Sequence, residues 1–220
     1  GVVQRIRSDP PGRAASESEA FTWFCLGLSH LHAGSPLAAL TALGEARSLG
    51  LRAPDGAAYE WVASRLWKEC PSEWRATCDV ILLDATRSAP HVVFDALVEV
   101  RGLLPPQIPA EFGILFAKPL DDPDAQIASA MLVATFAREQ ASADLFAAAE
   151  RRVLGRLQAA EGNVARWHGY LALLAYADGD RERARRSYAI YVEQARHVRA
   201  LDALLAGVFP IRTPASAAKP

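Results

Sequence analysis

The sequence of 220 residues predicts an all-α fold of about ten helices that pack as five antiparallel hairpins. Apolar residues recur at helical spacing along most of the chain, and no alternating pattern typical of strands persists. Ala and Leu, which favour helix, dominate these stretches. Proline also stands just ahead of five apolar stretches, at Pro36, Pro71, Pro90, Pro109 and Pro123. A proline is tolerated there because an N–H in the first helical turn would be unpaired in any case, so proline, which has no N–H, costs the helix no hydrogen bond.

Capping residues and turns then place the elements in order along the chain. Ser16 and Glu19 have the spacing of a capping box, and Gly34, Gly50 and Gly179 stand where helices should end. Later N-cap candidates are Ser35, Asp55, Asp122, Ser142 and Asn163. The expected helices span 16–33, 36–49, 55–69, 71–87, 90–103, 109–117, 123–139, 142–160, 163–177 and 180–206. Their short connections favour antiparallel packing of neighbours.

The same features divide the chain into segments. Residues 1–15 are expected to be a flexible or disordered N-terminal segment, 16–209 one helical-repeat domain, and 210–220 a flexible tail. The stretch 103–124 holds five prolines and is the candidate for a joint between two halves. The chain begins with Gly, so we also consider that it is a fragment of a larger protein.

Charge and composition narrow the classes of partner. Lys and Arg total 24 against 25 Asp and Glu, so the net charge of −1 gives no global attraction to nucleic acid or to anionic membranes. We therefore expect no nucleic-acid partner for this domain. No apolar run is long enough for a membrane span, and no membrane partner is expected. Three cysteines without metal-site spacing favour a reducing cytoplasm, with no metal and no cofactor.

Residues 21–51 carry a recognisable pattern. Trp23, Leu26 and Gly27 have the type and spacing of a Trp-x-x-Leu-Gly motif, Ala39 follows the turn, and Leu43 takes a position that is usually aromatic. This stretch resembles a tetratricopeptide repeat, in which two antiparallel helices form one unit. The resemblance implies that the units stack as a right-handed α-solenoid.

A weaker copy of the pattern lies at residues 168–195. Leu171 and Ala172 occupy the Leu-Gly position, a Gly-Asp turn follows, and Ala184 precedes Tyr188 by the expected spacing. Trp23 and His168 are 145 residues apart, or four intervals of about 36. This spacing fits five helix pairs, although the stretches between the two copies keep little more than helical periodicity.

The resemblance implies a role for each set of residues. The packing residues would be Trp23, Leu26, Gly27, Ala39, Leu43, Leu171, Ala172, Ala184 and Tyr188. The residues that face a concave, partner-binding groove would be Phe21, Phe24, Leu28, Leu31, His32, Arg166, Leu173 and Tyr176. Members of the family that clamp a terminal carboxylate carry Lys and Asn in this groove. Phe24 and Leu28 stand there instead, so a carboxylate clamp is not expected. The apolar groove would hold a hydrophobic helix, a second copy or a neighbouring domain, or would be covered by another part of the same chain.

No catalytic pattern stands out in the sequence. Phosphate-binding glycine loops, a nucleophile elbow and a zinc-binding His-Glu-x-x-His motif do not occur. Asp121, Asp122 and Asp124 are expected to cap a helix, and Cys78 to be a buried structural thiol. We therefore expect a non-catalytic protein–protein interaction module, an adaptor or scaffold that binds a protein, a peptide or a second copy. The alternatives are a sensory or regulatory helical-repeat domain of a larger bacterial transcriptional regulator, and an α-helical enzyme with an unrecognised site.

Overall fold

The computed structural model describes residues 13–104, 108–116, 120, 122–137, 143–160, 162–194 and 198–209. All regular elements in these ranges are helical, which confirms the predicted all-α class. The chain divides into two compact units, Gly1–Pro106 and Gln107–Pro220, and the division falls within the proline-rich stretch 103–124. Residues 1–12 and 210–220, for which flexible ends are expected, lie outside the described ranges.

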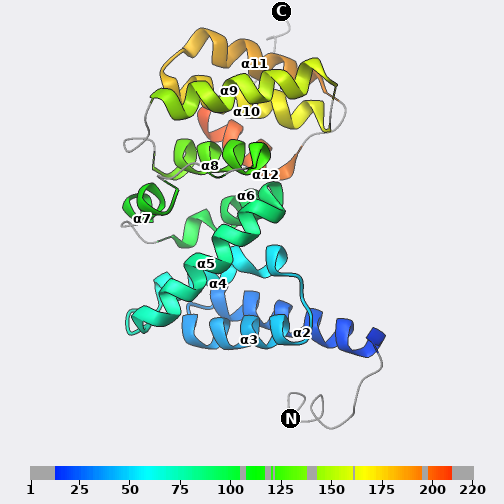
Figure 1. Ribbon diagram of the computed structural model, residues 1–220, viewed down its shortest axis with the longest axis vertical. Helices are drawn as coiled ribbons and strands as arrows, with labels where there is room; N and C mark the ends of the chain where they lie inside the picture. Colours follow the sequence, from blue (N-terminus) through cyan, green and yellow to red (C-terminus); the bar gives the residue numbers. More distant parts are fainter. Residues whose placement is uncertain are drawn as a thin grey trace, which may run out of the picture. The chain divides into compact units, whose positions relative to one another are not determined.

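Unit 1 consists of helices that each pack on their neighbour in the chain. Its elements are α2 (Arg13–His32), α3 (Pro36–Ser48), α4 (Ala53–Leu66), α5 (Ser72–Ser88), α6 (Pro90–Glu99) and a 3-10 turn η1 (Arg101–Leu103). The helices α2 and α3 lie side by side as a hairpin, α4 pairs with α5, and α4 also contacts α2, α3 and α6 (Figure 1). Helix α4 is therefore the centre of the unit, with Trp61 fully buried on it.

A close approach joins the two helices of the first hairpin. A Cβ atom on Gly27 would lie 2.6 Å from Cγ of Leu43, closer than real side-chain contacts allow. Both residues are buried. The absent side chain of Gly27 therefore sets how closely α2 and α3 pack.

Unit 2 is built around two strongly buried helices. Its elements are α7 (Ile108–Leu115), α8 (Pro123–Phe136), α9 (Ala143–Gln158), α10 (Val164–Asp178), α11 (Arg181–Glu193) and α12 (Arg199–Val208). Helix α8 is buried from Ile127 to Val133, and α10 packs against α8, α9, α11 and α12. A helix that is apolar on all sides belongs at the centre of a domain, where neighbours cover every face.

Several predicted boundaries are confirmed, and others need correction. The side chains of the predicted caps Asp122 and Asn163 each accept a bond from a backbone N–H in the first turn of α8 and α10. Asp180, which was not predicted as a cap, does the same for α11. The capping box at Ser16 is wrong as a helix start, because α2 begins at Arg13. Helix α4 likewise starts at Ala53, so Asp55 lies inside its first turn. Ser142, another predicted cap, lies outside the described residues.

The largest correction concerns the last predicted helix, 180–206, which is two helices. Helix α11 ends at Glu193, Gln194 is extended, and α12 starts again at Arg199. The hydroxyl of Tyr191 donates to the carboxylate of Asp202 at 2.7 Å and accepts the backbone N–H of Val198 at 3.2 Å. These bonds hold the start of α12 against α11, an arrangement that a continuous helix would not allow.

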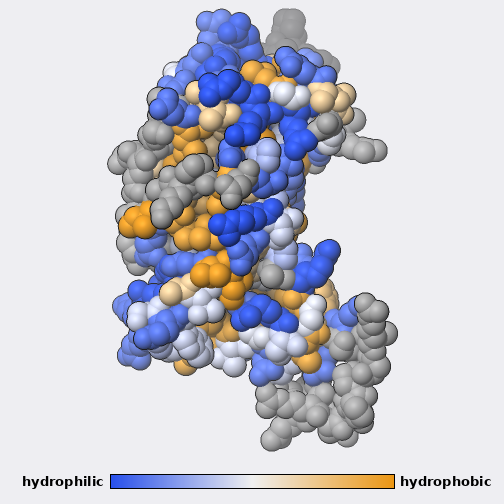
Figure 2. Space-filling model, in the orientation of Figure 1, coloured by the Kyte–Doolittle hydropathy of each residue, from blue (hydrophilic) through white to orange (hydrophobic). Residues whose placement is uncertain are grey.

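Within the described ranges, every helix is too short or too polar to span a lipid bilayer. Apolar side chains nevertheless reach the surface in both units, between larger hydrophilic areas, on the face shown in Figure 2. Among the large apolar side chains of the described residues, Ile114 and Phe21 are the most exposed, at 79% and 62%. The second of these lies beside another aromatic ring, that of Phe24.

Candidate functional site

Two of the predicted groove residues, Phe21 and Phe24, line a hollow between α2, α4 and α6. The hollow has a volume of about 420 Å³. Its lining residues, which we call the aromatic groove, are Phe21, Phe24, Leu51, Asp55, Tyr59, Val92, Asp95, Ala96 and Glu99. The structure thus brings part of the predicted groove together with residues of α4 and α6 that the repeat pattern did not indicate.

Three aromatic rings form the apolar side of the aromatic groove. The ring centroids of Phe24 and Tyr59 are 5.6 Å apart in an edge-to-face arrangement, and those of Phe21 and Phe24 are 6.4 Å apart. The hydroxyl of Tyr59 donates to the carboxylate of Glu99 at 3.1 Å, which fixes the ring between α4 and α6. Burial and the nearby Glu99 charge raise the pKa of Tyr59, so the phenol remains protonated as a donor.

Carboxylates surround this apolar side. Asp55, Asp95 and Glu99 line the hollow, and none of its described lining residues is Lys or Arg. Arg52 reaches Asp55 at 3.4 Å, but its side chain is 85% exposed, so water weakens this pair. The aromatic groove therefore offers aromatic rings to an apolar side chain and negative charge to a cation.

The other predicted groove residues of unit 1 lie elsewhere. Leu31 is buried, with 1% of its surface exposed, and belongs to the interior. Leu28 is half-buried and His32 is exposed, but neither lines the aromatic groove. Of the α2 residues predicted to face a groove, only Phe21 and Phe24 line this hollow, and their role in binding a partner stays a prediction.

The predicted groove residues of unit 2 do not form an open surface. Leu173 is buried, so its placement in a groove is wrong. Arg166 donates to the hydroxyl of Tyr170 at 3.1 Å. Tyr176 lies edge-on to Phe209 at 5.8 Å and has the guanidinium of Arg181 3.9 Å from its ring centroid. The unit thus covers this face with its own side chains.

The predicted packing residues occupy interior or half-buried positions. The buried ones are Gly27, Ala39, Leu43, Leu171, Ala172 and Ala184. Trp23, Leu26 and Tyr188 are half-buried. The ring of Tyr188 stacks on Phe209 at 4.7 Å, a partner outside the repeat pattern.

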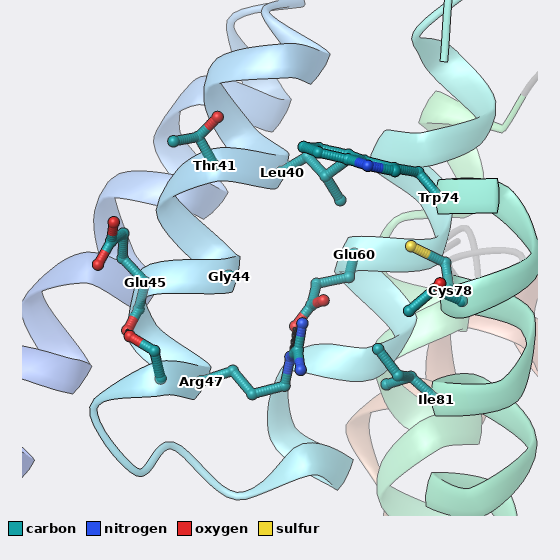
Figure 3. Close-up of a pocket in the computed structure, with 11 residues that line it drawn as sticks. Leu40, Thr41, Gly44, Glu45, Arg47, Glu60, Trp74, Cys78 and Ile81 are labelled. Carbon is teal, nitrogen blue, oxygen red and sulfur yellow. Dashed lines mark hydrogen bonds and ion pairs between the residues drawn. The ribbon is translucent and has the colours of Figure 1, made fainter. Parts of the chain in front are cut away.

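A second hollow, between α3, α4 and α5 of unit 1, was not predicted from the sequence. It encloses about 390 Å³, within the range of small-molecule sites. Its lining residues, which we call the Glu60 pocket, are Leu40, Thr41, Gly44, Glu45, Arg47, Ser48, Glu60, Trp74, Thr77, Cys78 and Ile81 (Figure 3). Leu40 and Arg47 enter from α3, Glu60 from α4, and Trp74 and Ile81 from α5.

The charged centre of the Glu60 pocket is an asymmetric ion pair. Nε of Arg47 donates to Oε1 of Glu60 at 3.2 Å, and the side chains are 44% and 4% exposed, respectively. Burial raises the pKa of Glu60, while the charge and hydrogen bond of Arg47 oppose that shift. The carboxylate is therefore fixed inside the pocket, and the guanidinium reaches it from the surface.

Apart from Glu45, the remaining walls are apolar or neutral. Trp74 leaves 50% of its surface exposed and packs edge-on against Trp67 at 5.9 Å. Burial and the Glu60 charge raise the pKa of Cys78 to about 11, so its thiol is protonated at neutral pH and a poor nucleophile. Cys78 is buried, as predicted.

One signal in the sequence points to this pocket. Glu60 is the one acid in the run Gly56–Val62, "GAAYEWV", whose other side chains are apolar or aromatic. A carboxylate in such a run has to be buried or to face a polar gap between helices. The sequence does not show that Arg47, thirteen residues earlier, meets it.

Metal chemistry has no support in the part of the chain that the structure describes. No group of three or more His, Cys, Asp or Glu side chains lies close enough there to hold a metal ion. Asp122 caps α8, and Asp124 pairs with Arg156 at 2.9 Å, which gives both acids structural roles; Asp121 lies outside the described residues. Comparison with protein-family models, with curated proteins and with solved structures found no match to the chain.

Proposed function

We propose that the chain is a non-catalytic protein–protein interaction module of the tetratricopeptide-like kind, and that it binds a basic, amphipathic segment in the aromatic groove. The observation that carries the proposal is the combination of Phe21, 62% exposed, with the rings of Phe24 and Tyr59 behind it. An exposed aromatic ring beside others is a typical anchor for a partner side chain.

The charge of the groove selects the class of partner. Asp55, Asp95 and Glu99 surround the rings, so a segment with Lys or Arg next to its apolar side chains is electrostatically complementary. An amphipathic helix that lays its apolar face in the groove meets both requirements. An acidic segment would bring like charges together and is disfavoured.

The proposal is tested with two designed peptides of about 15 residues, long enough for four helical turns. Both carry Leu and Phe at positions i, i+3, i+4 and i+7, and they differ only in having Lys or Glu elsewhere. Fluorescence anisotropy with the full chain should show binding of the Lys peptide and at least about tenfold weaker binding of the Glu peptide. Equal affinities for the two peptides would contradict the proposed partner class.

Substitutions in the groove locate the binding site. Phe24→Ala should weaken binding of the Lys peptide about tenfold or more, as expected for an aromatic anchor. Ile114→Ala is the matched control, because Ile114 is 79% exposed on α7 and lies outside the groove. If Phe24→Ala leaves the affinity unchanged, the groove is not the site.

A further inference from the structure

The Glu60 pocket contains a feature that partner binding in the aromatic groove does not use. Glu60 is 3% exposed, on a helix whose neighbouring residues are almost all apolar. Removing a carboxylate from water costs free energy unless a partner compensates for the lost hydration. The compensating partner is Arg47, which lies on a different helix and is itself half-exposed.

The two members of the ion pair differ in how freely their side chains can move. Glu60 sits on the buried face of α4, the central helix of unit 1, so its carboxylate has little freedom. Arg47 is in the last turn of α3, and Figure 3 shows its long side chain reaching from that helix into the pocket. The guanidinium can return to water at low cost, because almost half of the side chain is exposed already. The exchangeable member of the pair is therefore the cation.

The walls around the pair favour a cation with an apolar body. Leu40 and Ile81 supply aliphatic surface, and Cys78 supplies a neutral thiol. The indole ring of Trp74, half-exposed at the pocket, can hold a cationic group against its face. Glu45 adds negative charge at the rim, where Figure 3 shows its side chain away from the centre.

We propose that the Glu60 pocket is a binding site for a small organic amine, whose ammonium group takes the place of Arg47 on Glu60 and whose apolar body packs against Leu40, Trp74 and Ile81. The volume of about 390 Å³ accommodates one such molecule. Binding involves no covalent step. The site is formed by α3, α4 and α5, so it does not depend on the aromatic groove between α2, α4 and α6.

The test uses three probes that share one body and differ in charge: phenethylamine, 2-phenylethanol and phenylacetate. Isothermal titration calorimetry on the full chain should show binding of the amine, with the alcohol at least about tenfold weaker and the acid weaker still. Tighter binding of phenylacetate than of the amine would mean an anion site at Arg47 and would overturn the proposal. Absence of binding of all three probes at millimolar concentration would overturn it as well.

Substitutions of the two members of the ion pair should affect the affinity for the amine differently. Glu60→Gln should weaken binding of the amine on the order of a hundredfold, because the buried counter-charge is lost. Arg47→Ala should keep or tighten binding of the amine, because the competing cation is removed. Loss of amine binding in Arg47→Ala would overturn the proposal. This test remains valid even if the Glu60→Gln variant fails to fold.

Two further variants separate this site from its surroundings. Trp74→Leu should weaken amine binding several-fold through loss of the aromatic face. Val80→Ala is its control, because Val80 is exposed on the same helix and lies outside the pocket. Phe24→Ala, which tests the aromatic groove, should leave amine binding unchanged, so failure of one site is distinguishable from failure of the other.

Discussion

The hairpins α2–α3 and α10–α11 contain the two stretches predicted to be repeat units, yet the aromatic side chains of one are exposed and those of the other are covered. In the first hairpin, Phe21 is 62% exposed at the edge of a groove. In the second, Tyr176 and Tyr188 both contact the ring of Phe209, which comes directly after α12. The first face leaves Phe21 exposed to solvent, and the second is covered by the chain itself.

The difference arises from the helix that comes next in the chain after each hairpin. Helix α3 leads into α4, which places Tyr59 behind Phe24 and leaves Phe21 uncovered. Helix α11 leads into α12, which folds back onto α10 and brings Phe209 to the tyrosines. A repeat pattern therefore defines the faces of a hairpin, and the next element decides whether a face is available for binding.

The largest loss of stability is expected from substitution of Tyr191, which holds the start of α12 in place. Tyr191→Ala should lower the free energy of unfolding by about 3–5 kcal/mol, because it empties a buried aromatic site and removes the bonds to Val198 and Asp202. Urea denaturation measures this loss, and hydrophobic-dye binding should rise as α12 detaches.

Tyr191→Phe is the control for this variant, because it keeps the ring and removes only the hydroxyl. It should cost about 1–2 kcal/mol, the range for one or two lost hydrogen bonds. Burial and the bond to Asp202 raise the pKa of Tyr191, so the hydroxyl is protonated in the native protein and its removal deletes a donor to the carboxylate of Asp202. Equal costs for both variants would mean that ring packing does not anchor α12.

A second comparison concerns the two glycines at which neighbouring helices pack closely, Gly27 in unit 1 and Gly169 in unit 2. A Cβ on Gly27 would meet both Cγ and Cδ2 of Leu43, at 2.6 and 2.8 Å, whereas one on Gly169 would meet Cδ1 of Leu201 at 2.9 Å and the ring of Tyr191 at 3.2 Å. Gly27→Ala should therefore cost about 1–3 kcal/mol, with a smaller cost for Gly169→Ala. Thermal unfolding checks the order. Gly44→Ala is the control, since a Cβ there has nothing within 4 Å, and it should be neutral or slightly stabilising.

Sequence patterns predict the local part of this architecture well, for a physical reason. Helical periodicity and capping depend on neighbours in the chain, so the hairpins and the caps at Asp122 and Asn163 follow from the residues alone. The motif around Gly27 also identifies a close contact, because only a residue without a side chain permits it.

The features that the sequence did not predict depend on distant residues. The break after Glu193 lies in a stretch with continuous helical character, and tertiary bonds from Tyr191 hold the arrangement around it. Leu173 lies on the face of α10 assigned to a groove and is buried in unit 2. The meeting of Arg47 with Glu60 joins two helices through side chains that each look ordinary alone.

Removing the ring of Phe209, which covers the aromatic face of the hairpin α10–α11, should lower the free energy of unfolding moderately. Phe209→Ala deletes the ring that stacks on Tyr188 at 4.7 Å and lies edge-on to Tyr176. Two aromatic pairs together contribute about 1–2 kcal/mol, which is the expected loss in free energy of unfolding. Urea denaturation measures the loss, and acrylamide quenching of tyrosine fluorescence should show greater access to the face. If neither quantity changes, Phe209 does not cover the hairpin in solution.

The same substitution on the open face should have the smallest effect on stability. Phe21→Ala removes a ring that is already 62% exposed, so the free energy of unfolding should change by no more than about 0.5 kcal/mol. The affinity of the Phe21→Ala variant for the Lys peptide should nevertheless fall, whereas Phe209→Ala should leave that affinity unchanged. A ring that contributes little to folding and much to binding is expected only where the partner, and not the chain, completes the contact. A stability loss in Phe21→Ala as large as in Phe209→Ala would show instead that the first hairpin also uses its aromatic face for its own packing.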